Sequence, residues 1–197
     1  MALTREQVVG TAVGILSDFG LADLSMRRLA RELDVQVGAL YWHVKNKQEL
    51  LVDVAARLLG GIEVGVMHPG APEDPGAARA AVGHLARAVR AALVPVPDSA
   101  EVVQLAQTMQ PAALRPLTTL RELLEEAGVP PARSAWAQHL LLNHILGSVA
   151  AQQDRAVLEE AGTERGGPDL GEEAFAWGVD AILAGVLGVR EPSPRTA

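Results

Sequence analysis

The sequence contains no cysteine among its 197 residues. Disulfide bonds, thiolate catalysis and cysteine-ligated zinc sites are therefore excluded, and a reducing compartment is compatible with this composition. Uninterrupted apolar runs stay short of the roughly 18 residues of a membrane-span candidate. Residues 1–20 carry charged side chains at helix-like spacing, which is not the pattern of a signal peptide. We therefore expect a cytoplasmic protein that does not enter the membrane.

Aromatic side chains are scarce: the chain has one tyrosine, two phenylalanines and three tryptophans. Tyr41 and Trp42 are nevertheless adjacent, in the stretch LYWHVKNK that also supplies Lys45 and Lys47. Rings that fill a core would be spread out, whereas rings clustered beside lysines are typical of a surface that contacts a negatively charged partner. Core packing of either ring remains the alternative at this point, since neighbouring helical positions point in different directions.

The charge of the chain is uneven along its length. The net charge is −7, which argues against a generally basic nucleic-acid-binding protein. Residues 1–60 hold seven basic and seven acidic residues, so the whole negative excess lies in residues 61–197. Residues 25–47 alone hold five basic residues and two acidic ones. A small positive region on an acidic protein indicates local contact with phosphate.

Helical periodicity dominates and alternating strand patterns are rare, which predicts an all-α fold. Thr4 followed by Gln7 predicts a capping box at the start of a first helix. One face of that helix is expected to be buried, and we expect Gly20 to end it. The residues of this face are Val8, Val9, Ala12, Ile15, Leu16 and Phe19.

Two shorter helices and a longer one are expected next. Ser25 can cap a short helix, a tight corner at Asp34 follows, and a third helix is expected from about Gln36 to His43. Asn46 can cap a longer helix whose inward positions include Leu50, Val54 and Leu58.

Glycine and proline then mark a domain boundary. Gly60–Gly61 and the segment HPGAPEDPG (68–76) interrupt the helical pattern. We place a three-helix domain with its exit helix at residues 1–60 and a larger helical domain at residues 61–197. Helices in the larger domain are expected at about 75–93, 99–108, 111–127, 131–158 and 171–189.

Residues 25–43 have the size of a helix-turn-helix, in which the second helix enters the DNA major groove. The stretches LSMRRLARELDV and GALYWHVKNKQELL resemble the tetracycline-repressor (TetR) family of bacterial transcriptional regulators. FAWGVDAILAGV (175–186) is similar to the last helix of the subgroup that contains the family's namesake. The resemblance implies an N-terminal DNA-binding domain and a helical ligand-binding and dimerisation domain. It is specific over residues 4–60 and weak over the rest.

The resemblance also implies roles for individual residues. Arg27 matches the arginine that reaches a base edge, and arginine to guanine is the commonest specific contact. Val37, Gly38 and Ala39 occupy positions that read bases in the namesake, but they are too small or apolar to hydrogen-bond a base. We therefore expect Arg27 and Gln36 to carry most direct readout. The DNA-binding candidates are Arg27, Arg28, Gln36, Val37, Gly38, Ala39, Tyr41, Trp42, His43 and Lys47.

Dimerisation is expected from the last two helices. Residues 135–151 are apolar nearly all round, which implies burial on more than one side. Small residues at Gly178, Ala181, Gly185 and Gly188 follow one stripe of the final helix and allow close approach of another helix. Packing within one subunit is the alternative. A twofold dimer would present two recognition helices to a pseudo-palindromic operator.

Effector-binding candidates are polar groups on apolar helices, together with one tryptophan that can wall a cavity. Each of them is, taken alone, more often an ordinary core or surface group. The namesake's drug-contacting histidine is matched here by Glu63, which disfavours a magnesium–tetracycline ligand. The candidates are His84, Gln104, Gln107, Gln110, Trp136, His139 and Asn143, with His144 beside them.

Catalytic motifs are absent: the chain has no HExxH, GxSxG, GxGxxG or P-loop pattern. We predict no catalytic residue, metal or cofactor. The function predicted is a homodimeric repressor released from double-stranded DNA by a small apolar effector. Two alternatives are a helical protein-binding adaptor and a DNA-binding protein that responds to no small molecule.

Overall fold

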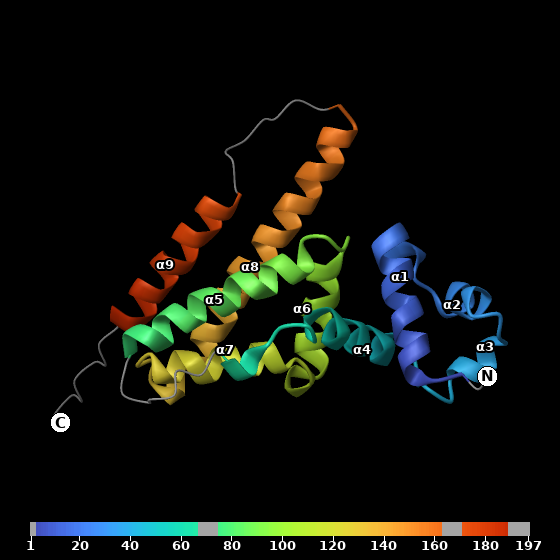
Figure 1. Cartoon of the computed structure of the whole chain (residues 1–197), viewed down its shortest axis with the longest axis horizontal. Coiled ribbons are helices and arrows are strands. Elements are labelled where there is room, and N and C mark those ends of the chain that lie inside the picture. The colour runs from blue at the N-terminus through green and yellow to red at the C-terminus, as the bar shows by residue number, and fades with distance from the viewer. Residues whose placement is uncertain (1–2, 67–74, 163–170, 189–197) are drawn as a thin grey trace, which may run out of the picture.

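The computed structural model describes residues 3–66, 75–162 and 171–188 and is helical, with no strand in those ranges. This confirms the all-α prediction. A head of four helices comes first, then a body of five (Figure 1). The head consists of α1 (Arg5–Asp23), α2 (Met26–Glu32), α3 (Val37–Leu40) and α4 (Lys47–Leu59). The body consists of α5 (Pro75–Leu93), α6 (Ser99–Met109), α7 (Arg115–Glu126), α8 (Pro131–Glu160) and α9 (Glu172–Gly188), with short 3-10 turns at Val64–Val66 and Pro111–Ala113.

Helix starts in the head follow the expected caps. The Thr4 hydroxyl accepts a hydrogen bond from the Gln7 N–H at 3.2 Å, and the Gln7 side chain accepts one from the Thr4 N–H at 2.9 Å. Ser25 caps α2 in the same way, and the Asn46 side chain accepts from the Glu49 N–H at 2.8 Å. These bonds satisfy backbone donors that lack a partner within the helix.

Four details of the head differ from expectation. Phe19 is not buried but 53% exposed, and the guanidinium of Arg28 lies over its ring, 3.8 Å from the ring centroid. Gly20 does not end α1; its φ of 77° kinks the helix, which continues to Asp23. The third helix ends at Leu40 rather than His43, since the chain turns there and brings Val44 into the core. Leu58 is only partly buried.

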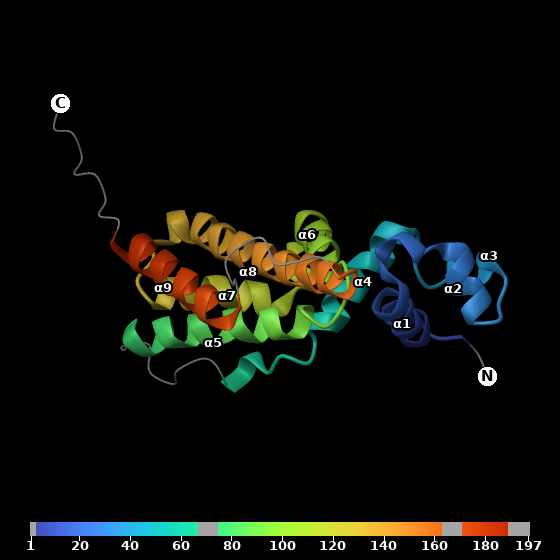
Figure 2. The same cartoon turned by 90° about the horizontal axis from the view of Figure 1, so that it is seen from above.

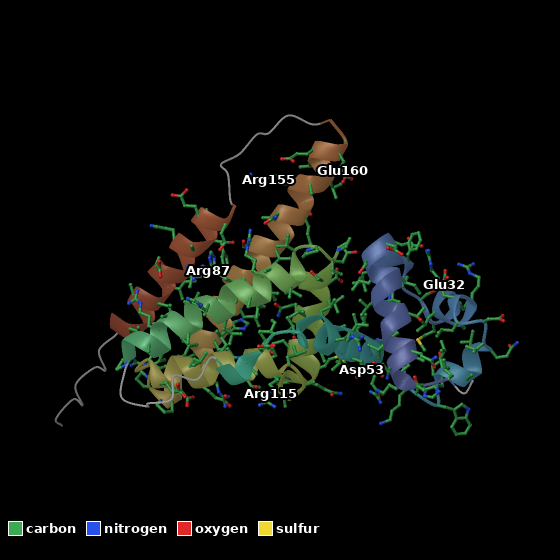
Figure 3. The ribbon with its side chains drawn as sticks, in the orientation of Figure 1. Glu32, Asp53, Arg87, Arg115, Arg155 and Glu160 are labelled. Carbon is green, nitrogen blue, oxygen red and sulfur yellow. The ribbon has the colours of Figure 1, made fainter. Side chains whose placement is uncertain are left out.

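Ion pairs tie the two long helices of the head together. Arg5 lies 2.7 Å from Asp53 and 3.2 Å from Glu49, so α1 is joined to α4. Figure 3 labels Asp53 on α4 beside α1. Partial burial lowers the pKa of Arg5, but hydrogen bonds and charge from Asp53 and Glu49 outweigh it, so the pKa lies above its ordinary value.

The body is built on α5, α7 and α8, and α9 packs against α5 and α8. Two glutamines of α8 satisfy backbone carbonyls inside it. The Gln138 amide donates to the Leu117 carbonyl at 2.7 Å, and Gln153 donates to the Val96 carbonyl at 2.6 Å, in the turn after α5. Side-chain amides that bond to backbone carbonyls in this way fix how α8 packs on its neighbours. The expected helix at 111–127 begins instead at Arg115, after a 3-10 turn that starts at Pro111.

Helix α6 lies between the head and the rest of the body, against α4 (Figure 2). A second contact joins α1 to the start of α6: the Asp98 carboxylate accepts a hydrogen bond from the Leu21 N–H at 2.7 Å. Within the described ranges no helix is long and apolar enough to cross a membrane.

Candidate nucleic-acid interface and effector site

Helices α2 and α3 form a compact unit around a buried seam. Leu29, Ala30 and Leu40 are buried, and Asp34 turns the chain with a φ of 52°. The Val35 N–H donates to the Ala30 carbonyl at 3.0 Å and holds this turn closed. Because the apolar side chains point inward, the opposite sides of both helices are left for polar residues.

The outward sides of this unit carry the residues expected to read DNA bases. Arg27 on α2 and Gln36 before α3 are exposed. Gly38 is exposed but offers no side chain, and Val37 and Ala39 are half-buried. Among these positions only Arg27 and Gln36 carry side chains that can hydrogen-bond a base, so their role in readout stays a prediction.

Tyr41 and Trp42 follow α3 directly and both are exposed, Trp42 to 89%. Core packing of Trp42 is excluded by this exposure. The two adjacent rings form an exposed aromatic patch beside basic residues, and exposed apolar patches mark contact with a partner more often than single exposed rings do. His43 beside them is half-buried.

Two of the basic candidates have partners inside the head. Arg28 lies over the ring of Phe19, pairs closely with Asp23, and its side chain is only 16% exposed. Lys47 is half-buried at the start of α4, and its ammonium donates to the Leu21 carbonyl at 3.5 Å. Arg28 is therefore held by contacts within the head, whereas Lys47 is held only by one long hydrogen bond.

The effector candidates do not converge on one cavity. Gln104 lines a groove of about 510 Å³ between head and body, together with Lys47, and Asn143 and His144 line another of about 300 Å³ between α8 and α9. Gln107 has a buried side-chain oxygen without a hydrogen-bond partner. The remaining candidates lie at the surface: His84, Gln110, Trp136 and His139 are exposed.

Some polar residues of the body were missed by the sequence analysis, and Arg90 is the clearest. Arg90 on α5 is only 7% exposed. Its guanidinium donates to Ser148 at 2.9 Å and to Glu172 at 3.0 Å, and it also bonds Gln152. The spacing could have revealed it, because Arg90 lies on the apolar stripe of α5 between Ala86 and Leu93.

The helices expected to dimerise divide their small residues between two surfaces. Gly178 is buried against the His144 ring within the same chain. Ala181, Gly185 and Gly188 are exposed. The small-residue stripe is therefore partly an internal packing surface, which agrees in part with the alternative of packing within one subunit. Val189, where the final helix was expected to end, lies outside the described residues.

Comparison with known proteins gives matches to both parts of the chain. The model of the tetR family of bacterial regulatory proteins matches residues 9–54, and that of the tetracyclin repressor-like C-terminal domain matches residues 71–176. Tetracycline repressor protein class C of Escherichia coli is 30% identical over 95% of this chain and 92% of its own length.

Solved structures are similar over nearly the whole chain. BioQ with its natural double-stranded DNA operator has a TM-score of 0.72 at 32% identity, covering 95% of this chain and 99% of BioQ. The TetR family protein ActR of Streptomyces coelicolor, in complex with (S)-DNPA, has a TM-score of 0.77 at 28% identity, covering 95% of this chain and 98% of ActR. Since both parts of the fold match, this chain belongs to the tetR family of bacterial regulatory proteins and is a transcription regulator, not an enzyme.

Proposed function

We propose that the protein is a homodimeric repressor that binds a pseudo-palindromic DNA operator and is released from it by a small apolar effector. Residues 1–60 are its DNA-binding domain, and residues 61–197 bind the effector and the second subunit. The observation that carries the proposal is the exposed Tyr41–Trp42 pair at the end of α3, on a helix-turn-helix whose base-facing positions include Arg27 and Gln36.

In this proposal the head binds DNA with α3 in the major groove. Arg27 and Gln36 contact base edges, and Val37 and Ala39 contact thymine methyl groups. Tyr41, Trp42, His43 and Lys47 contact phosphate and sugar. Arg28 supports this surface from behind, through Phe19 and Asp23. The similarity to BioQ, whose structure contains its DNA operator, supports the proposal.

The second subunit would cover the outer face of α8 and α9. Exposed residues recur on α8 at helical spacing, including Trp136, Leu140 and Gly147, and on α9 at Trp177 and Ala181. Exposed large apolar side chains such as Trp136, Leu140 and Trp177, gathered on these two helices, are typical of a protein–protein interface. A twofold axis through this face would pair two heads, and the operator they would bind presents successive major grooves about 34 Å apart, one turn of DNA.

Effector binding would act by favouring one arrangement of the heads over another. The contact of α6 with α4 and the bond from Leu21 to Asp98 connect the body to the head, so movement of α6 would turn the DNA-binding surface. The similarity to ActR, solved with a bound small molecule, supports a ligand-responsive body.

Selection of bound duplexes from a random DNA pool at two salt concentrations tests the proposal. We expect a pseudo-palindrome whose half-sites are about one DNA turn apart, with affinity that falls steeply as salt rises. Failure to enrich any motif at either salt concentration would contradict the repressor. A protein-binding adaptor, the second candidate, would show no salt-dependent DNA binding at all.

A further inference from the structure

Residues 41–46 form a linking segment that joins α3 to α4 and begins with the exposed aromatic pair. The end next to α3 is well anchored. The N–H groups of His43 and Val44 both donate to the Leu40 carbonyl, at 2.9 and 3.0 Å, and the Val44 side chain is buried. The last two residues of the segment are exposed. Because neither of them reaches the core, the end next to α4 needs an anchor of another kind.

Glu49, in the first turn of α4, supplies this anchor. Its carboxylate accepts a hydrogen bond from the Lys45 N–H through Oε2 at 3.2 Å, and its own N–H donates to the Asn46 side chain at 2.8 Å. In a capping box the acidic side chain of the first turn returns to the N–H of the cap residue. Here the cap residue is Asn46, and the carboxylate bonds one residue further back, within the linking segment.

The second oxygen of this carboxylate is held by α1. Arg5, the first residue of α1, donates to Glu49 Oε1 at 3.2 Å. The Glu49 side chain is only 21% exposed, so water competes for these bonds less than at an open surface. One carboxylate therefore joins three parts of the head: the start of α1, the first turn of α4 and the linking segment.

Asp53 provides a close comparison one turn further along α4, where Figure 3 labels it. Its carboxylate accepts hydrogen bonds from Arg5 at 2.9 and 3.0 Å, and its side chain is 23% exposed. Within the described part of the head, this carboxylate bonds Arg5 and no residue of the linking segment. Glu49 and Asp53 thus share a charge, a helix, a degree of burial and an arginine partner, and they differ in the bond to Lys45.

We propose that Glu49 is a positioning residue for DNA binding, which holds the linking segment and its aromatic pair in place against α1 and α4. The inference rests on the proposed function, in which Tyr41, Trp42 and His43 contact phosphate and sugar. A surface that is ordered before binding loses less conformational entropy when it meets its partner. Since the charge of Glu49 itself repels phosphate, the gain in affinity comes through the backbone at Lys45.

Titration of the selected operator with the full-length variants Glu49→Ala and Asp53→Ala tests this role. Both variants remove one negative charge from α4 and one partner from Arg5, and the loss of a negative charge near DNA by itself tightens binding. We expect Glu49→Ala to weaken operator binding about three- to tenfold, because the bond to Lys45 is lost. Asp53→Ala should leave operator binding unchanged or slightly tighter. Equal affinities of the two variants would overturn the proposal, since a general loosening of α1 from α4 affects both alike.

Glu49→Gln separates the position of the side chain from its charge. The glutamine oxygen can still accept a hydrogen bond from the Lys45 N–H, whereas the charge opposite Arg5 is removed. We expect this variant to bind the operator within about twofold of the parent. Binding as weak as that of Glu49→Ala would contradict the proposal, because the ion pair with Arg5 would then be the contact that matters.

Amide hydrogen exchange of the free protein gives a readout that needs no DNA. The Lys45 amide should exchange about threefold or more faster in Glu49→Ala than in Asp53→Ala, because only the first variant removes its acceptor. The same exchange rate in both variants would show that Glu49 does not hold the linking segment.

Failure of this role and failure of the repressor are distinguishable. A parent protein that selects an operator, with both alanine variants binding it equally well, refutes the role of Glu49 and keeps the repressor. A parent protein that selects no DNA motif refutes the repressor and the positioning role with it, whatever the exchange rate of the Lys45 amide.

Discussion

At the scale of single residues, the contact between Gly20 and Asp98 departs from local rules in three ways. Gly20 has a φ of 77° inside a helix, and Asp98 has a φ of 57°. Asp98 precedes α6 but makes no side-chain cap bond to it. Its carboxylate instead accepts the Leu21 N–H. Unusual backbone conformations persist only where surrounding contacts stabilise them. Here the contact between Asp98 and the backbone at Leu21 stabilises both conformations and joins the head to the body.

Gly20→Ala should therefore destabilise the protein by about 1–3 kcal/mol. A Cβ at this position would lie 2.8 Å from the Asp98 carboxylate, and alanine disfavours the positive φ. Gly14→Ala is the matched control in α1, since a Cβ there meets nothing within 4 Å. Chemical denaturation of both variants measures the difference. Equal free energies of unfolding for the two variants would show that the close approach of Asp98 to Gly20 does not require glycine at position 20.

Base and phosphate contacts should respond differently to mutation. Arg27→Ala should cost about 1–3 kcal/mol of operator binding and relax sequence preference at one position. Lys47→Ala should weaken all sequences alike and make affinity less dependent on salt. Titrations against the operator and single-base variants at several salt concentrations separate the two patterns. The same response from both variants would refute the division of contacts.

At the scale of elements, the sequence predicted helix starts well because capping is a local interaction. Thr4, Ser25 and Asn46 cap the helices expected of them. Helix ends were harder, since the length of α3 depends on Val44 reaching a core made by distant residues. The predicted burial of Phe19 was wrong for a similar reason. Arg28, which contacts the Phe19 ring, comes from another helix, and residue spacing within α1 carries no information about that contact.

Two glycines of α9 should behave differently when a methyl group is added. A Cβ at Gly178 would overlap the His144 ring, so Gly178→Ala should destabilise the α8–α9 pair by about 1–3 kcal/mol. Gly185 has nothing within 4 Å of its Cβ position in the single chain. Gly185→Ala should leave chain stability intact and weaken the dimer.

Thermal unfolding and sedimentation equilibrium separate these effects. His144→Ala makes room for the new methyl group, so the double variant with Gly178→Ala should cost less than the sum of the single changes. Additive losses would mean that the two residues do not clash. A Gly185→Ala protein that dimerises as tightly as the parent would remove Gly185 from the proposed interface.

At the scale of the whole molecule, the sequence predicted two parts but not their connection. The basic region and the glycine-rich boundary predict a division between residues 1–60 and 61–197, whereas the hydrogen bond from the Leu21 N–H to the Asp98 carboxylate joins residues 77 positions apart. The effector candidates were chosen one helix at a time, and only tertiary packing shows that His84 and His139 lie at the surface. The hydrogen-bond partners of Arg90 lie on α8 and α9, and no local sequence pattern predicts that these helices pack beside α5.

We propose that two heads, joined through α8 and α9, bind two successive major grooves of one operator. The most direct test is the mass of the complex formed with a selected operator, alongside the affinity for a duplex that contains one half-site. We predict two chains per full operator and much weaker binding to the half-site, because the second head then lacks its contacts. One chain per duplex, with equal affinity for full and half sites, would contradict the account.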